Sequence, residues 1–119
     1  MSNKSKNKGD AAEREIAEIL SRETGLEIRR KLGAGRQDDE GDLEGLPNHV
    51  LQVANWADTA RAAREKTKGA EQQRENAKVD YAASLIRFRG GKWVVCLSIE
   101  QWLRYVKLVV HTFNMTSKS

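Results

Sequence analysis

The stretch GDLEGLPNHVLQVAN, residues 41–55, decides which fold the chain is expected to adopt. Its two ends, residues 42–46 and 49–55, are strand candidates. Pro47 and Asn48 between them are a turn signal, because proline presets a turn dihedral and asparagine tolerates unusual ones. The stretch therefore predicts a β-hairpin in the middle of the chain.

This hairpin would bring an acidic and an amide side chain together. Side chains alternate faces along a strand, so Gln52 and Ala54 point to one side. With a three-residue turn over 46–48, Asp42 lies directly opposite Gln52. A carboxylate and an amide oxygen form a hard-oxygen site of the kind that Mg²⁺ accepts. The pattern alone favours the alternative, in which Asp42 is a loop residue and Gln52 a polar residue on a solvent face.

The remaining elements extend the hairpin into a mixed α/β chain. Periodicity, capping and turn residues predict a helix over residues 11–24 with Asp10 as N-cap, a strand over 26–32, a helix over 58–78, strands over 82–89 and 93–97 joined by Gly90-Gly91, and a last helix over 99–109. The expected order is α-β-β-β-α-β-β-α, a mixed central sheet flanked by helices. Trp93 and Trp102 are expected in the core.

Size and composition limit the protein class. A chain of 119 residues is large enough for one domain and too small for two. We expect that domain over residues 10–110, with a flexible basic arm over 1–9 and a frayed tail over 111–119. No apolar run approaches the roughly 20 residues that span a bilayer, and the lysine-rich N-terminus lacks the apolar stretch of a signal peptide. The single cysteine, Cys96, excludes an internal disulfide framework. A cytoplasmic protein is expected.

Positive charge clusters on both sides of an acidic segment, residues 38–44. The net charge is +4 and the pI is about 9.4. The flanking cations, which are the candidate DNA-binding residues, are Arg29, Arg30, Lys31, Arg36, Arg61, Arg64, Lys66 and Lys68. Acid flanked by base suits a metal site beside a phosphate-binding surface. The alternative for any one of these cations is a solvated helix face. Trp56 is a candidate for either the core or DNA stacking.

Three short motifs carry a family resemblance. They are KGDAAERE at residues 8–15, GDL at 41–43 and LQVAN at 51–55. In this order and spacing the chain resembles the Holliday-junction resolvases of the archaeal and phage type, which belong to the PD-(D/E)XK nuclease superfamily. The resemblance extends over residues 8–105. It implies a restriction-endonuclease-like fold. It also implies that the protein is located in the cytoplasm, either of a cell or of a phage-infected host.

The resemblance also implies an activity and its residues. It implies Mg²⁺- or Mn²⁺-dependent phosphodiester hydrolysis at four-way DNA junctions by a homodimer, in DNA recombination and repair. Glu13, Asp42 and Gln52 match the metal-ligand positions, with the backbone carbonyl of Val53 as a further ligand. Glu13 has an alternative, because it stands three residues after Asp10 and could complete a capping box there.

Position 54 departs from the family pattern. The resemblance places a catalytic lysine there, whose ammonium orients the attacking water and offsets charge on the phosphate. Ala54 can do neither, so the chain is expected to be inactive. Two explanations remain: a deliberate lysine-to-alanine change, which the persistence of the other site residues favours, or a natural homologue that lost catalysis. Alternative functions are a non-catalytic branched-DNA-binding module and a restriction- or nicking-type nuclease.

Overall fold

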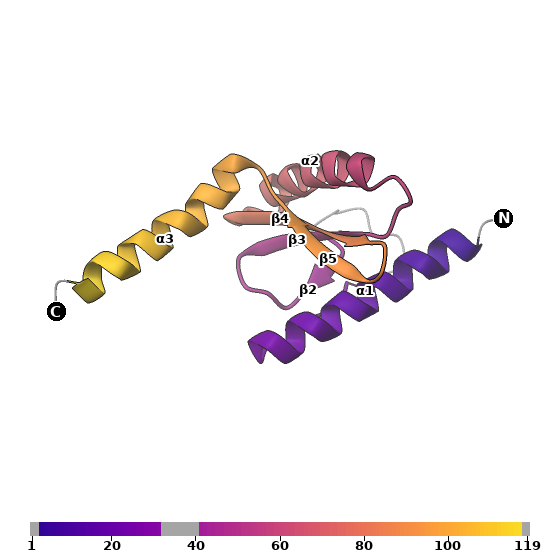
Figure 1. Ribbon diagram of the computed structural model, residues 1–119, viewed down its shortest axis with the longest axis horizontal. Coiled ribbons are helices and arrows are strands. Elements are labelled where there is room, and N and C mark those ends of the chain that lie inside the picture. The colour runs from indigo at the N-terminus through magenta and orange to yellow at the C-terminus, as the bar shows by residue number, and fades with distance from the viewer. Residues whose placement is uncertain (1–2, 32–40, 118–119) are drawn as a thin grey trace.

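The chain alternates helices and strands in the expected order. A computed structural model describes residues 3–31 and 41–117. Its elements are α1 (Asn3–Thr24), β1 (Arg29–Arg30), β2 (Leu43–Glu44), β3 (His49–Ala54), α2 (Thr59–Ala77), β4 (Tyr81–Phe88), β5 (Lys92–Cys96) and α3 (Ile99–Ser117) (Figure 1). This order is the predicted α-β-β-β-α-β-β-α, and the chain is a mixed α/β protein.

The central sheet has the strand order β3-β4-β5 and lies between α1 and α2. β3 pairs in parallel with β4, and β4 pairs antiparallel with β5. Because side chains alternate along a strand, Leu51 and Val53 face α1, where they pack with Ile16. Ala54 faces the other way and packs with Ala62 of α2. The two helices therefore cover opposite faces of the sheet (Figure 1).

The predicted pairing of the hairpin is wrong. β2 pairs antiparallel with β1, with Arg30 opposite Leu43, and not in a ladder with β3. Gly45 explains the difference. It has φ +109°, and a Cβ there would collide with the carbonyl oxygen of Glu27, so the end of β2 is pressed against the segment that leads into β1. Asn48 does adopt the left-handed turn conformation expected of it, with φ 62°.

The helices are longer than predicted. α1 begins at Asn3 rather than at residue 11, so the stretch assigned to a flexible arm is largely helical and Asp10 lies inside the helix, not at its cap. α3 continues to Ser117 through the stretch assigned to a frayed tail. α2 runs without interruption and is capped by Asp58, whose carboxylate accepts from the backbone N–H of Arg61 at 3.0 Å.

The last helix is anchored to the sheet through its first two turns, as far as Tyr105, whose hydroxyl lies 2.7 Å from Nε2 of His49. The backbone N–H of Gln101 donates to the hydroxyl of Ser98 at 3.1 Å, as the capping signal predicts. The side chain of Gln101 is buried and binds the backbone of the β4 entry, accepting from Ala82 at 3.1 Å. Beyond its first two turns α3 projects away from the sheet (Figure 1). Trp102 is 53% exposed, which corrects its expected place in the core.

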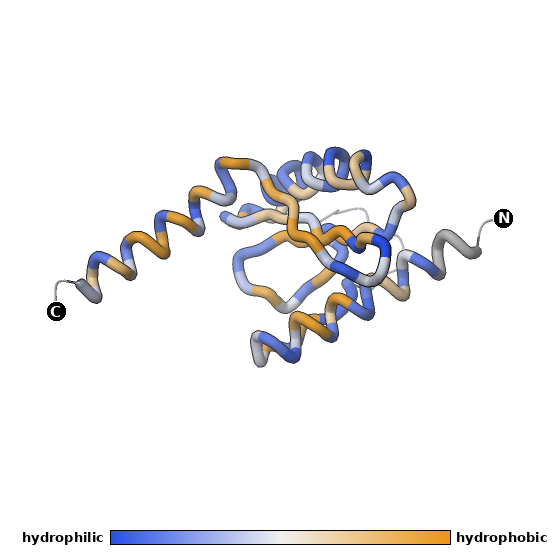
Figure 2. The backbone as a smooth tube through the Cα atoms, in the orientation of Figure 1, coloured by the Kyte–Doolittle hydropathy of each residue, from blue (hydrophilic) through white to orange (hydrophobic). Residues whose placement is uncertain are grey.

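The projecting helix is rich in apolar residues, which Figure 2 shows as orange segments along its backbone. The exposed large apolar residues of α3 are Ile99, Trp102, Leu103, Leu108, Val109, Val110, Phe113 and Met115. Within residues 3–31 and 41–117, every helix lacks the length or the apolar character needed to cross a membrane.

Candidate active site

Asp42 is held against β3 by two backbone hydrogen bonds. Its N–H donates to the carbonyl of Leu51 at 2.8 Å, and its Oδ2 accepts from the N–H of Val53 at 2.8 Å. Gly41 permits this approach, because a Cβ there would lie 3.0 Å from the Leu51 carbonyl oxygen and φ is +106°. Asp42 thus lies beside the 51–53 segment through single contacts, and not in the predicted strand ladder that would place it directly opposite Gln52.

Glu13, on α1, is the second carboxylate of the candidate site. Its side chain is 16% exposed, and its Oε1 accepts from Nε of Arg30 at 3.0 Å. Burial raises the pKa of Glu13, the hydrogen bond from Arg30 lowers it, and the negative charge of Asp42 raises it further. Glu13 and Asp42 are therefore close enough for their charges to interact. The capping-box alternative for Glu13 is excluded, because α1 begins ten residues earlier, at Asn3.

Gln52 faces α2 from the middle of β3. It is a buried polar residue, and its Oε1 accepts from Nζ of Lys66 at 3.2 Å. Its Nε2 donates to Oε1 of Gln73, which belongs to α2 as Lys66 does. The amide is thus fixed at both ends, with its oxygen directed at the Lys66 ammonium. That ammonium also lies 3.9 Å from Oδ2 of Asp42.

A hollow of about 500 Å³ adjoins these groups. Glu13 lines it from α1, Ala54 from β3 and Lys66 from α2, and Trp56 lies beyond the end of β3. Ala54 itself is buried, with 4% of its surface exposed, and contributes no polar group. The position that the resemblance assigns to lysine therefore borders the hollow without a charge of its own.

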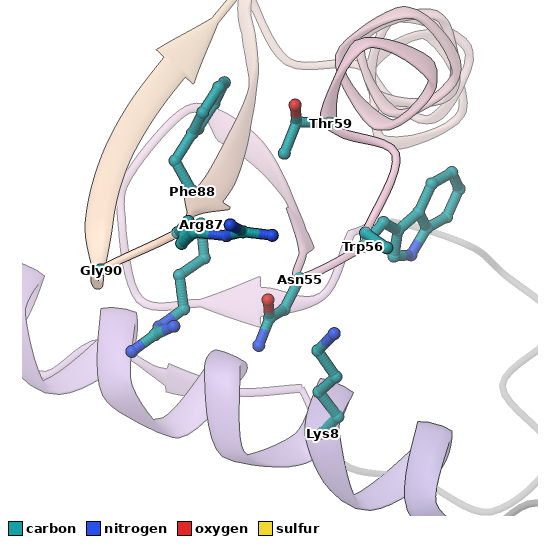
Figure 3. A pocket seen from close by; sticks show the side chains of 9 residues that line it. Lys8, Asn55, Trp56, Thr59, Arg87, Phe88 and Gly90 are labelled. Carbon is teal, nitrogen blue, oxygen red and sulfur yellow. The ribbon is translucent and has the colours of Figure 1, made fainter.

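A second hollow, of about 510 Å³, continues from the first (Figure 3). The two share Lys8, Asn55, Trp56 and Ala57. Figure 3 shows Lys8 rising from α1 toward Asn55, with Trp56 at the side and the strand end carrying Arg87 and Phe88 opposite. Arg87 and Arg89 also line this hollow. Three of the nine residues that line it are therefore cations.

Sequence reasoning missed part of this cationic surface. It considered Lys8 as an arm residue able to reach a phosphate, but it treated Arg87 and Arg89 as the end of an ordinary strand. The parallel pairing of β3 with β4 brings the ends of both strands to one side, because Ala54 is opposite Ile86. The topology was the missing information: once β3 and β4 are parallel, residues following both strands must meet.

The structure places the predicted DNA-binding residues in different environments. Arg30 is turned inward, with Nη2 2.9 Å from Asp10 and Nε 3.0 Å from Glu13. Arg29 is exposed and pairs with Glu27 and Glu44. Lys31 donates its backbone N–H to Asp42 at 2.8 Å. Arg36 lies outside the described residues.

The predicted cations of α2 also differ from one another. Arg61 is exposed, pairs with Glu65 at 2.7 Å and stacks over Trp56 with its guanidinium carbon 5.8 Å from the ring centroid. Arg64 and Lys68 are exposed on the helix surface. Of the predicted α2 cations, Lys66 is the one whose ammonium lies near Asp42 of the candidate site. Trp56 is half-buried and packs against Ala54 and Ile86, with Nζ of Lys66 5.7 Å from its ring centroid.

The residues that the resemblance matches to metal ligands carry oxygen donors. Glu13 and Asp42 supply carboxylates, Gln52 an amide oxygen and Val53 a backbone carbonyl, which are the donor types that Mg²⁺ accepts. The pKa of Glu13 is raised mainly by burial and further by the negative charge of Asp42, and a divalent cation bound there would favour the charged carboxylate. Within the described residues, no three His, Cys, Asp or Glu side chains gather closely enough to hold a metal. Asp38, Asp39 and Glu40 lie outside those residues.

Comparison of the chain with protein-family models, with curated proteins and with solved structures gives no match.

Proposed function

We propose that the protein is a divalent-metal-dependent DNA endonuclease that hydrolyses phosphodiester bonds in four-way junctions. One observation supports this most directly: Glu13 lines a hollow together with the cations Lys8 and Lys66, and Asp42, whose charge acts on Glu13, lies 3.9 Å from the Lys66 ammonium. Acidic oxygens hold metal and cations hold phosphate, so their juxtaposition is what hydrolysis of a phosphodiester requires.

The residues divide this work between them. Glu13 and Asp42 would hold Mg²⁺ or Mn²⁺, with the Gln52 amide and the Val53 carbonyl as neutral donors. When bound, the ion polarises the phosphate and lowers the pKa of a water. Arg30 holds Glu13 in place through a 3.0 Å hydrogen bond, and the Val53 N–H does the same for Asp42 at 2.8 Å. A carboxylate held in one orientation loses little entropy when it binds the ion.

The DNA backbone would follow the cationic side of the two hollows. Lys8 and Arg89 border them, and Arg61 lies over Trp56 at their edge. Phosphate contacts of this kind give affinity without base specificity, which suits recognition by shape. The preference for a four-way junction, the restriction-endonuclease-like classification of the fold and the cytoplasmic location come from the motif resemblance.

Cleavage of a synthetic four-way junction tests the proposal. The chain and its Ala54→Lys variant are compared with Mg²⁺, Mn²⁺ or EDTA, and a linear duplex with the same arm sequences is the control. We expect metal-dependent cutting of the junction and little cutting of the duplex. Tight junction binding with no cutting by either form would establish a non-catalytic binding module. Equal cutting of the duplex would indicate a restriction- or nicking-type nuclease, and absence of junction binding would refute the proposal.

We further propose that two copies associate through α3 and β5. A four-way junction carries two related strands to cut, and a two-fold dimer brings one active site to each. β5 is an edge of its sheet and exposes Val95, which lines a shallow hollow together with Ile99 and Trp102 of α3. An exposed apolar surface of this extent is typical of an interface between protein chains.

Introducing charge on α3 is expected to separate the copies. Val109 and Phe113 are 67% and 69% exposed and lie one helical turn apart on the same side. Val109→Asp with Phe113→Asp should convert a dimer of the chain to a monomer in light scattering, with nicking replacing paired cuts. Asn114→Asp, which adds a charge at an exposed polar position of the same helix, should leave the dimer intact. A monomeric parent chain would contradict this interface.

A further inference from the structure

Lys66 differs from the other cations of α2 in where its ammonium lies. Its Nζ is 3.2 Å from Oε1 of Gln52 and 3.9 Å from Oδ2 of Asp42, and its side chain is 25% exposed. It lines the same hollow as Glu13 and Ala54. A lysine gives up hydration and side-chain entropy to be held this way, so the contacts with the acidic site must compensate.

The packing around Ala54 explains how Lys66 reaches this point. Ala54 packs directly on Ala62, which is fully buried, so two small side chains let α2 lie close to β3. Lys66 is four residues after Ala62 and therefore projects from the same side of the helix, one turn further along. A long side chain at position 54 would enter the hollow that Lys66 already lines.

We propose that Lys66 supplies, from α2, the catalytic ammonium that the strand position Ala54 lacks. This inference rests on the proposed nuclease function and extends it, because it makes the chain as it stands competent to cut. Under this proposal Ala54 does not inactivate the protein, because the catalytic ammonium comes from α2 instead of β3.

The reaction requires only the positive charge of this lysine. A water oxygen bonds to phosphorus and releases a proton to solvent, while the bond from phosphorus to the leaving sugar oxygen breaks and that oxygen takes up a proton. The Lys66 ammonium stays protonated throughout. It contacts a non-bridging phosphate oxygen and offsets the negative charge that builds there, as fixed cations do in phosphoryl transfer.

The competing explanation is that Lys66 only neutralises Asp42. Under that explanation, a metal ion would take over its role, and removing Lys66 would leave the rate at saturating metal unchanged. Under our proposal the phosphate takes the ammonium when DNA binds, so removal slows the chemical step itself. Single-turnover kinetics at saturating protein and Mg²⁺ distinguish the two, because they report the chemical step apart from binding.

The experiment compares the parent chain with five variants on the synthetic junction, and Ala54→Lys alone is one of them. Lys66→Met is expected to lower the single-turnover rate by about 100-fold, the scale seen when one charge-stabilising group is removed. Its junction affinity, measured with Ca²⁺ in place of Mg²⁺, should change less than about threefold, since one phosphate contact among several is lost. Lys66→Arg should retain part of the rate. Lys66→Met combined with Ala54→Lys should regain it. Lys92→Met, at an exposed lysine of β5 outside both hollows, should behave as the parent.

Each other outcome overturns the inference in a recognisable way. If the parent chain does not cut and Ala54→Lys does, the ammonium belongs on the strand, and the proposed nuclease function survives without Lys66. If Lys66→Met cuts at the parent rate, or loses affinity alone, Lys66 is not catalytic. If Lys66→Met is unfolded by circular dichroism, the rates of Lys66→Arg and Ala54→Lys decide. If no form cuts or prefers the junction, both proposals fail together.

Discussion

Replacing Asp42 by asparagine is expected to lower the rate of junction cleavage by about a thousandfold while the fold persists. A bound divalent cation contributes several kcal/mol to the stabilisation of a hydrolytic transition state, and about 1.4 kcal/mol corresponds to a factor of ten in rate. Asparagine keeps an oxygen that can accept from the Val53 N–H, now at 2.8 Å from Asp42, so the backbone contact to β3 is retained. The charge that holds the metal is lost.

Two measurements accompany this variant. Calorimetric titration with Mn²⁺ should show weaker binding to Asp42→Asn than to the parent chain, because one of two anionic ligands has become neutral. Junction affinity without metal should stay equal or increase, since a negative charge facing the phosphates has been removed. Cleavage within tenfold of the parent would show that Asp42 is not a metal ligand of the reaction.

Asp58→Asn is the matched control for this charge change. Asp58 caps α2 by accepting from the N–H of Arg61, and asparagine is an equally good N-cap residue. This variant therefore also converts an aspartate that binds a backbone N–H into an asparagine, but it does so outside the candidate site. Its cleavage rate and its free energy of unfolding should match those of the parent.

Much of this site could be predicted from strand periodicity. The alternation along β3 correctly separates Gln52 and Ala54 from Leu51 and Val53, because side-chain direction in a strand repeats every two residues. The element order also follows from local patterns. The partner of β2 could not be predicted in the same way, since a two-residue strand has too little pattern to specify its register.

Lys66 shows a second kind of limit. In the sequence it is one of several cations in a charged helix, and no single spacing distinguishes it from Lys68. The signal lay in the stripe Ala62, Lys66, Ala70 and Gln73, which repeats at helical intervals and faces β3. Two buried alanines on that stripe indicate close approach to the sheet. A cation between them is therefore directed inward, a conclusion that needs the fold to say what lies opposite.

Replacing Gly45 by alanine is expected to cost about 3 kcal/mol of folding free energy and to disturb the site through Asp42. The φ of +109° lies in a region that side chains avoid, which alone costs about 1–3 kcal/mol. A Cβ would also collide with the carbonyl oxygen of Glu27 and lie 3.0 Å from Cα of Ile28, so β1 and β2 would have to separate. Asp42 directly precedes β2, and its carbonyl accepts the N–H of Lys31 next to β1 at 2.8 Å.

Urea unfolding measures how far Gly45→Ala lowers the free energy of unfolding. Gly69→Ala is the control, and it is expected to raise this free energy. Gly69 lies inside α2, where an added Cβ meets nothing within 4 Å. Alanine there should raise the free energy of unfolding by roughly 0.5–1 kcal/mol, because glycine loses more backbone entropy in a helix. A Gly45→Ala chain as stable as the parent would mean that β2 does not depend on this contact. If Gly45→Ala instead unfolds early and also binds Mn²⁺ weakly, while Gly69→Ala keeps parental Mn²⁺ affinity, the β1–β2 pair is what positions Asp42 for the metal.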